Sequence, residues 1–246
     1  MLPPSPVPGT GRRKRLSVPE KSTASFTEGL RLEADPVFEA IFDHPFVRGI
    51  AAGDVSGERL AHYVRQDYQY LTVFCRVYGL AISKCEDRED IAFFNEQIGF
   101  VLDDENHPHR NLAAVSGYPM AELEREAALA PSALAYTRHM LHAAHSGAMG
   151  ELLCALLPCP LTYREIGLRL KEEVEPDDSH PFRPWIEFYA DPRIGEICNE
   201  FTRRVDRLAA AAGEGERGRM EENFLTSCRL EYLFWEMAYG LEGWPV

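Results

Sequence analysis

The sequence predicts an all-α protein. From about Phe26 onward, apolar residues recur with a period near 3.6, which is the period of an amphipathic helix. The alternating apolar and polar pattern of a half-buried strand and the Asn-Gly signal of a tight hairpin do not occur in the sequence. Short stretches rich in Gly, Pro, Asp and Glu separate the periodic segments. We therefore expect a helical bundle whose binding sites lie between helices.

The expected helices span 36–51, 56–85, 88–116, 131–147, 148–158, 160–175, 182–190, 192–213 and 216–240. In the first half of the chain, Ala-Ala-Gly-Asp-Val-Ser-Gly ends the first helix, and Ser56 is the expected N-cap of the second. Cys-Glu-Asp-Arg-Glu-Asp separates the second helix from the third, and Ser-Gly-Tyr-Pro ends the third. Each boundary therefore falls where turn-forming residues interrupt the period.

The helices of the second half are bounded in the same way. Ala-Leu-Ala-Pro-Ser marks the start of the helix over 131–147, and the Pro-Cys-Pro stretch separates the two helices that follow. Glu-Pro-Asp-Asp-Ser-His-Pro and Ala-Asp-Pro bound the short helix over 182–190. Asp191 is the expected N-cap of the next helix, with Pro192 at its first position. Ala-Gly-Glu-Gly-Glu precedes the last helix.

Composition limits the domain organisation and the class of partner. The 246 residues are 45% hydrophobic, which suits a single all-α domain over 26–246 behind a disordered tail, rich in Pro, Ser and Arg, over 1–25. The basic run 11–15 is not followed by an apolar segment, so it does not resemble a secretion signal. The net charge of −13 argues against nucleic acid as partner. No apolar run could span a membrane, and six cysteines without a Cys-x-x-Cys pair indicate a reduced, cytoplasmic protein.

A first candidate cluster lies within 62–74. Asp67 and Tyr70 are three residues apart and Phe74 is four further on, so the three share one helix face. A carboxylate on an aromatic face is costly to bury unless a group donates a hydrogen bond to it. The cluster is either part of a ligand site or a surface aspartate beside core aromatics.

A second candidate is Cys159, which stands between Pro158 and Pro160. Pro160 disfavours the α region for the residue before it, so we expect Cys159 at or near the N-cap of the helix that carries Tyr163. Free N–H groups and the helix dipole favour a thiolate there, which can act as a nucleophile. The alternative is an inert core thiol in a kinked helix.

A third candidate is Glu231, which has Phe234 and Trp235 three and four residues further along an aromatic helix. Such surroundings are expected to raise the pKa of the carboxyl, which suits a proton donor or acceptor near neutral pH. The alternative is an ion pair with an arginine at the rim of the helix. Together the clusters suit a flat, uncharged ring as ligand, bound by stacking and by a carboxylate.

Six motifs resemble the TenA family, thiaminase II, in order and spacing across about residues 36–244. They are HPFVRGI (44–50), YVRQDYQYL (63–71), AYTRHM (135–140), ELLCALLPCPLTYREIG (151–167), PWIEFYAD (184–191) and EYLFWEMAY (231–239). The resemblance implies a haem-oxygenase-like multi-helix bundle and a homotetramer, with no cofactor. It also implies hydrolysis of aminomethylpyrimidine to the hydroxymethyl pyrimidine in thiamin salvage, and in many members cleavage of thiamin itself.

The resemblance also implies roles for single residues. Cys159 matches the nucleophile that adds to the pyrimidine ring, Glu231 the acid/base, and Asp67 the carboxylate that holds the amidine edge of the pyrimidine. The positions that line or hydrogen-bond the ligand are Tyr70, Tyr136, Tyr163, Tyr189 and Phe234. The late cysteine assigns the chain to the cysteine-containing branch. Leu230 departs from the pattern, because many relatives carry an aromatic residue there.

Three other interpretations stay open at this point. The stretch 103–110 offers Asp103, Asp104, Glu105, His107 and His109 as metal ligands. A metal-bridged bundle needs ligands from several helices, and the only histidine after residue 145 is His180, so we expect no metal. The second alternative is a non-catalytic pyrimidine-binding or regulatory protein. The third is an oxidase of quinone-cofactor synthesis on the same fold, for which the acidic and aromatic clusters are poorly suited.

Overall fold

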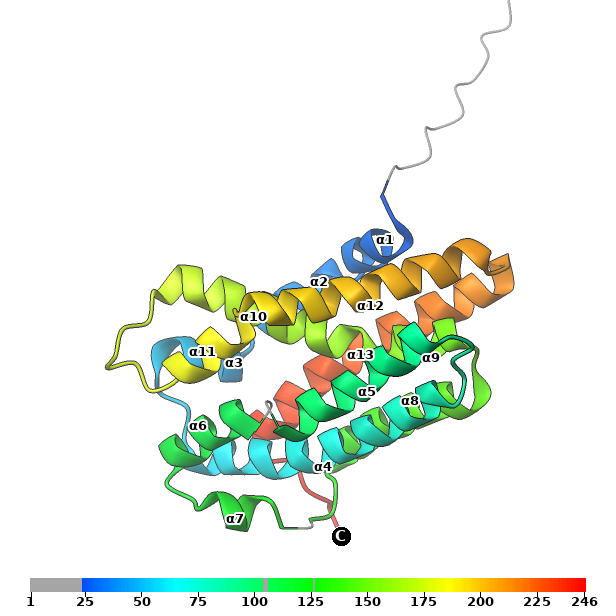
Figure 1. The fold of residues 1–246 in the computed structure, drawn as a ribbon. Coiled ribbons are helices and arrows are strands. Elements are labelled where there is room, and N and C mark those ends of the chain that lie inside the picture. The colour runs from blue at the N-terminus through cyan, green and yellow to red at the C-terminus, as the bar shows by residue number, and fades with distance from the viewer. Residues whose placement is uncertain (1–23, 104–105, 126) are drawn as a thin grey trace, which may run out of the picture.

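The computed structural model describes residues 24–103, 106–125 and 127–246, and within these ranges it contains helices and no strand (Figure 1). The all-α prediction is therefore confirmed. Residues 1–23 of the predicted tail lie outside the described residues. The helices are α1 (Phe26–Glu33), α2 (Asp35–Phe42), α3 (Pro45–Ala52), α4 (Gly57–Ile82), α5 (Arg88–Asp103), α6 (Asn106–Ser116), α7 (Met120–Leu123), α8 (Pro131–Ser146), α9 (Met149–Leu156), α10 (Pro158–Val174), α11 (Arg183–Tyr189), α12 (Pro192–Ala211) and α13 (Glu214–Gly240).

The expected helix ends agree with the structure at the two predicted caps. The Ser56 hydroxyl accepts from the N–H of Arg59 at the start of α4, and the Asp191 carboxylate accepts from the N–H of Arg193 at the start of α12. These bonds satisfy N–H groups that have no partner inside the helix. Both predicted N-caps are therefore confirmed.

Two expected helices are each divided in the structure. The helix expected over 36–51 is interrupted at His44, which has an extended backbone. His44 is the N-cap of α3: its Nδ1 accepts a hydrogen bond from the N–H of Phe46, and Pro45 is the first residue of the helix. The helix expected over 88–116 becomes α5 and α6, separated by residues 104–105, which are not described. The helices α1 and α7 were not among the expected elements.

The long helix α13 crosses the middle of the bundle, and the long helix α4 packs against it from one side (Figure 1). α4 packs against α5, α6 and α8, and α13 packs against α8, α9 and α2. Between α4 and α13, the rings of Tyr63 and Trp235 stack with centroids 5.5 Å apart and planes 13° apart. Both side chains are almost completely buried, so these two aromatic residues, each from one of the six sequence motifs, belong to the core of the bundle.

The contact of α10 with α11 depends on a glycine. A Cβ atom at Gly167 would lie 2.6 Å from the backbone carbon of Tyr189, so a larger residue would push the two helices apart. This close approach brings Tyr163 of α10 and Tyr189 of α11 together, with ring centroids 4.9 Å apart.

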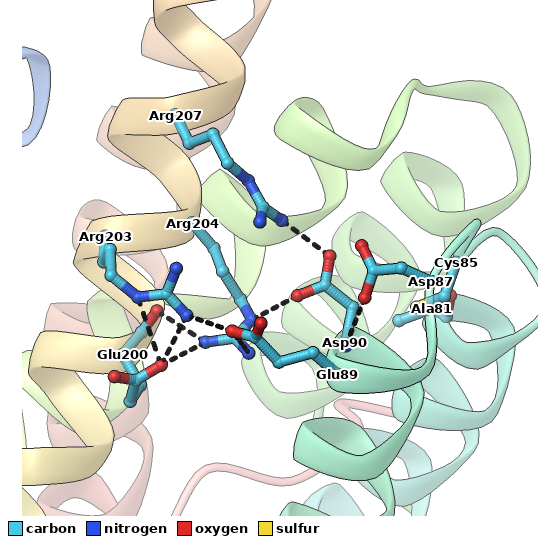
Figure 2. A network of polar contacts seen from close by, with 9 residues as sticks. All are labelled: Ala81, Cys85, Asp87, Glu89, Asp90, Glu200, Arg203, Arg204 and Arg207. Atoms are coloured by element: carbon cyan, nitrogen blue, oxygen red, sulfur yellow. Dashed lines mark hydrogen bonds and ion pairs between the residues drawn. The ribbon is translucent and has the colours of Figure 1, made fainter.

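A network of charged residues joins α5 to α12 (Figure 2). The buried guanidinium of Arg204 donates from Nε to Asp90 at 2.8 Å and lies 3.9 Å from the centroid of the Phe93 ring. Arg207 donates to the second oxygen of Asp90 at 2.6 Å. The first half of α5 is thereby fixed to α12, and the second half of α5 forms part of the wall of the site described below.

Candidate functional site

Five helices bring the predicted site residues into one part of the core. Asp67 and Tyr70 lie on α4, Tyr136 on α8, Cys159 and Tyr163 on α10, Tyr189 on α11, and Glu231 and Phe234 on α13. All eight are buried, Cys159 being the most exposed at 9%. Spacings of three or four residues place Asp67 with Tyr70, and Glu231 with Phe234, on the same side of their helices. None of the eight lies on the protein surface.

Glu231 is the central acid of this cluster. The Tyr136 hydroxyl donates to its Oε1 at 2.7 Å, and its carboxyl also makes a side-chain hydrogen bond with Cys159. Burial raises the pKa of Glu231 to about 8, and the negative charge of Asp67 adds to this, while the hydrogen bonds from Tyr136 and Cys159 act in the opposite direction. The carboxyl can therefore give or accept a proton near neutral pH.

Asp67 is paired with His109 across the contact of α4 and α6. The His109 Nε2 and the Asp67 Oδ2 are 2.7 Å apart, and both side chains are buried. The burial of Asp67 excludes the alternative of a surface aspartate. The sequence indicated His109 only as a metal ligand and did not predict this pairing, because the two residues are 42 positions apart and no spacing rule connects them.

Aromatic side chains fill the space around the two carboxyls. The ring of Tyr70 lies 5.0 Å from that of Tyr136 and 5.4 Å from that of Phe234, measured between centroids. The hydroxyls of Tyr63 and Tyr163 share a hydrogen bond of 2.6 Å, so Tyr63 is a further member of the cluster. Burial raises the pKa of Tyr70 well above its usual range, and neighbouring Cys159 contributes. The phenols therefore stay protonated and can donate hydrogen bonds.

Cys159 lies near the start of α10, as expected, but in a different backbone conformation. We predicted that Pro160 would exclude it from the α region; the structure instead has it as the second residue of α10, in helical backbone. The reason is that Leu157 is also helical, at φ −57° and ψ −36°, so α9 continues into α10 through Pro158. Both prolines fall in the first turn, where the missing N–H is tolerated.

The Cys159 side chain borders a small cavity of about 40 Å³, which is room for about three water molecules. The cavity is lined by Leu71, Phe74, Tyr78, Gln97, Phe100, Val101, Cys159, Pro160, Tyr163, Tyr189, Ile194 and Ile197. Asp67 and Glu231 are absent from this lining, and Cys159 connects Glu231 to the cavity through its hydrogen bond with that carboxyl. The Cys159 thiol is thus accessible from the cavity, and Glu231 is within hydrogen-bonding distance of that thiol.

The metal-ligand interpretation involves residues that are only partly described. Asp104 and Glu105 lie outside the described residues, and His109 is paired with Asp67. In the ranges that the structure describes, no three His, Cys, Asp or Glu side chains come together as a metal site would require.

The fold and these residues define a helical bundle that encloses a buried cluster of a thiol, two carboxyls and several phenols, a candidate small-molecule site. The chain belongs to the TENA/THI-4/PQQC family, whose model matches residues 32–241. A relative from Halalkalibacterium halodurans, named aminopyrimidine aminohydrolase, is 36% identical over 223 residues, which are 89% of this chain and 98% of the relative.

Solved structures support the same assignment. A protein from Silicibacter sp. TM1040, named a TenA family transcription regulator, is 30% identical and superposes with a TM-score of 0.76 over 87% of this chain and 96% of its own. A domain with a heme oxygenase-like fold from Shewanella denitrificans is 13% identical, with a TM-score of 0.66 over 89% of this chain and 94% of its own. The second likeness shows the fold alone, and it confirms the predicted haem-oxygenase-like bundle.

Proposed function

We propose that this chain is an aminopyrimidine aminohydrolase of thiamin salvage. In this proposal it converts aminomethylpyrimidine and water to the hydroxymethyl pyrimidine and ammonia, and thiamin is the second substrate to be tested. The name and the 36% identity of the Halalkalibacterium relative support an enzyme of this class. One arrangement in the site carries the proposal: a single buried carboxyl, Glu231, hydrogen-bonds both the candidate nucleophile Cys159 and the phenol of Tyr136.

In the proposed reaction Glu231 and Cys159 act as a pair. Glu231 in its ionised form takes the thiol proton, and the Cys159 sulfur forms a bond to a ring carbon of the pyrimidine. The added electron pair expels the amine from the exocyclic CH₂ as the C–N bond breaks, and the amine leaves with a proton from Glu231. Water then adds to the exocyclic carbon and gives its proton to Glu231. The sulfur–carbon bond then breaks with its electron pair on the sulfur, the aromatic ring is restored, and Glu231 returns its proton to the sulfur.

Asp67 is the proposed anchor for the amidine edge of the pyrimidine. His109 occupies its Oδ2, so Oδ1 is the oxygen we assign to the substrate N–H groups. Tyr70, Tyr136, Tyr163, Tyr189 and Phe234 are the proposed stacking and hydrogen-bonding partners of the ring. A pyrimidine is larger than a cavity of about 40 Å³, so we expect lining side chains to move when the substrate enters.

The test compares product formation by the wild type and by Cys159→Ser, with aminomethylpyrimidine and with thiamin as substrates. We expect Cys159→Ser to lower kcat by at least about 100-fold, because the covalent route needs the sulfur. Cys75→Ser is the matched control, since that thiol lies on α4 and does not line the cavity, and it should retain activity. Hydroxymethyl pyrimidine formed at an undiminished rate by Cys159→Ser would exclude covalent catalysis by this residue.

The second candidate is a non-catalytic regulatory protein that binds a pyrimidine, and the regulatory part of it is favoured by the name of the Silicibacter relative, a TenA family transcription regulator. Under this alternative Cys159→Ala keeps its affinity for the pyrimidine in calorimetry, and the wild type shows no turnover. Turnover by the wild type excludes it.

We also infer a homotetramer from the family resemblance and a cytoplasmic location from the cysteine pattern of the sequence. The structure adds that no disulfide joins cysteines within the described part of the chain. It adds too that none of the helices described is both long enough and apolar enough to cross a bilayer. Light scattering on the purified chain measures the oligomeric state directly.

A further inference from the structure

His109 of α6 lies outside the six sequence motifs and yet is buried against one of the predicted site residues. Its Nε2 is 2.7 Å from the Asp67 Oδ2, and the two side chains are 3% and 8% exposed. An ionised carboxylate only accepts hydrogen bonds, so the His109 Nε2 is the donor when Asp67 carries its charge. The imidazole therefore compensates for the burial of this carboxylate.

The packing of α6 on α4 fixes the place of His109. The two helices run antiparallel: Gly57 starts α4 beside Ser116 at the end of α6, where an added Cβ would lie 2.6 Å from the Ser116 carbonyl oxygen. Asp67 and His109 meet about 15 Å further along the same contact. Leu112, three residues after His109, is completely buried on the same side of α6. A packed helix, and not a loop, thus holds the imidazole.

Asp67, the partner of His109, acts electrostatically on other members of the site. Burial raises the pKa of Glu231 to about 8 and that of Tyr163 well above its usual range, and the negative charge of Asp67 adds to both shifts. A buried acid beside a second acid keeps its proton unless a donor stabilises its charge. The hydrogen bond from His109 favours the ionised form of Asp67 and fixes the plane of its carboxylate.

We propose that His109 is a positioning residue that acts on the substrate through Asp67. This inference rests on the proposed function, in which Asp67 holds the amidine edge of the pyrimidine. While the imidazole holds Oδ2, Oδ1 keeps one direction for the substrate N–H groups. Without this donor, Asp67 loses its fixed orientation or its charge, and the anchor for the ring is weakened. His109 itself does not touch the ring in this proposal.

The experiment measures the Kd of hydroxymethyl pyrimidine by calorimetry and kcat/KM for aminomethylpyrimidine. His109→Leu removes the donor, and we expect it to weaken binding and to lower kcat/KM by about 10-fold each. His109→Gln carries an amide N–H in place of Nε2–H and should stay within about 3-fold of the wild type. His107, exposed on the same helix, provides the matched control, and His107→Leu should match the wild type.

A double-variant cycle separates positioning from a purely structural role. In an Asp67→Ala background, His109→Leu should lower kcat/KM by less than about 2-fold further, because no carboxylate is left to orient. A residue that only stabilises the fold would cost the same factor in both backgrounds. Thermal unfolding of every variant identifies folding defects. If His109→Leu does not fold, His109→Asn takes its place with the same expectations, because its shorter amide does not reach Oδ2.

Each other result contradicts a defined part of the proposal. Equal losses in the two backgrounds, equal losses in His109→Leu and His109→Gln, or no loss in His109→Leu would overturn the role of His109 and leave the proposed hydrolysis intact. A wild type that forms no hydroxymethyl pyrimidine refutes the proposed function, and the role of His109 with it.

Discussion

Glu231 shows how one buried residue couples catalysis to stability. Its carboxyl is 2% exposed and lies near Asp67, so ionising it inside the protein is costly, and its pKa rises to about 8. In the unfolded chain the same group titrates near 4.5. Its contribution to stability is therefore fully present below pH 4.5 and is lost progressively as the pH rises to about 8. The acidic function that we propose thus makes folding less favourable at neutral pH.

Replacing Glu231 with glutamine should therefore stabilise the protein while removing its activity. Gln keeps an oxygen for the Tyr136 hydroxyl but has no proton to hold, so the free energy of unfolding at pH 7 should rise by as much as about 3 kcal/mol. Urea unfolding at pH 5, 7 and 8 measures this, and the difference from the wild type should grow with pH. Glu222→Gln, an exposed position on α13, is the control and should change little. A pH-independent difference would show that Glu231 titrates normally.

At the scale of elements, the charged network between α5 and α12 holds in place the helix α5, whose second half lines the cavity. Asp90 accepts hydrogen bonds from both Arg204 and Arg207 (Figure 2). Gln97, which lines the cavity, follows seven residues later on the same helix. Two turns of helix therefore separate the charged network from the cavity wall. The network positions that wall without contacting the proposed substrate.

Removing the buried member of this network should be far more destabilising than removing the exposed one. Arg204 is 2% exposed and Arg203 is 45% exposed at the side chain, and both pair with Glu200 and Glu89. We expect Arg204→Ala to lower the free energy of unfolding by about 3 kcal/mol, since it leaves Asp90 less compensated and opens a void beside Phe93. Arg203→Ala should cost less than about 1 kcal/mol. Equal losses in urea unfolding would contradict this account.

The periodicity of the sequence predicted most elements, but not their breaks or their contacts. The caps at Ser56 and Asp191 were foreseen because their signals are local, whereas the interruption at His44 depends on a backbone conformation that a period does not encode. Spacing placed Asp67 with Tyr70 on one helix. It could not pair Asp67 with His109 or place Gln97 and Cys159 in the wall of one cavity, because these arrangements join different helices and arise only from packing.

At the scale of the whole molecule, the site is part of the hydrophobic core. The ring of Tyr63 stacks on Trp235, and the hydroxyl of Tyr63 shares a hydrogen bond with the Tyr163 hydroxyl. One side chain therefore belongs to both the hydrophobic core and the candidate site. We infer that changes to the site will alter the stability of the whole bundle. Every activity comparison therefore needs an accompanying measurement of unfolding.

The contacts of α1 indicate that the folded domain starts near Ser25. Ser25 and Glu28 form a capping box that begins the helix, and Thr27 and Arg31 connect it to Asp206 of α12 and Glu165 of α10. All of these groups lie at or beyond Ser25, so a chain that begins at Ala24 keeps every one of them. We expect it to retain the Tm of the full chain within about 2 °C and its full activity.

A chain that begins at Ala34 is the matched comparison, because it loses α1 together with the bonds to Asp206 and Glu165. It also uncovers Phe38, over which the Arg31 guanidinium lies at 3.7 Å from the ring centroid. Phe38 is completely buried in the full chain, and exposing such a side chain costs about 2 kcal/mol before the lost bonds are counted. Calorimetry should therefore show a Tm lower by several degrees for this chain only. A fall of similar size for the chain that begins at Ala24 would mean that the domain starts before residue 24, against the predicted boundary.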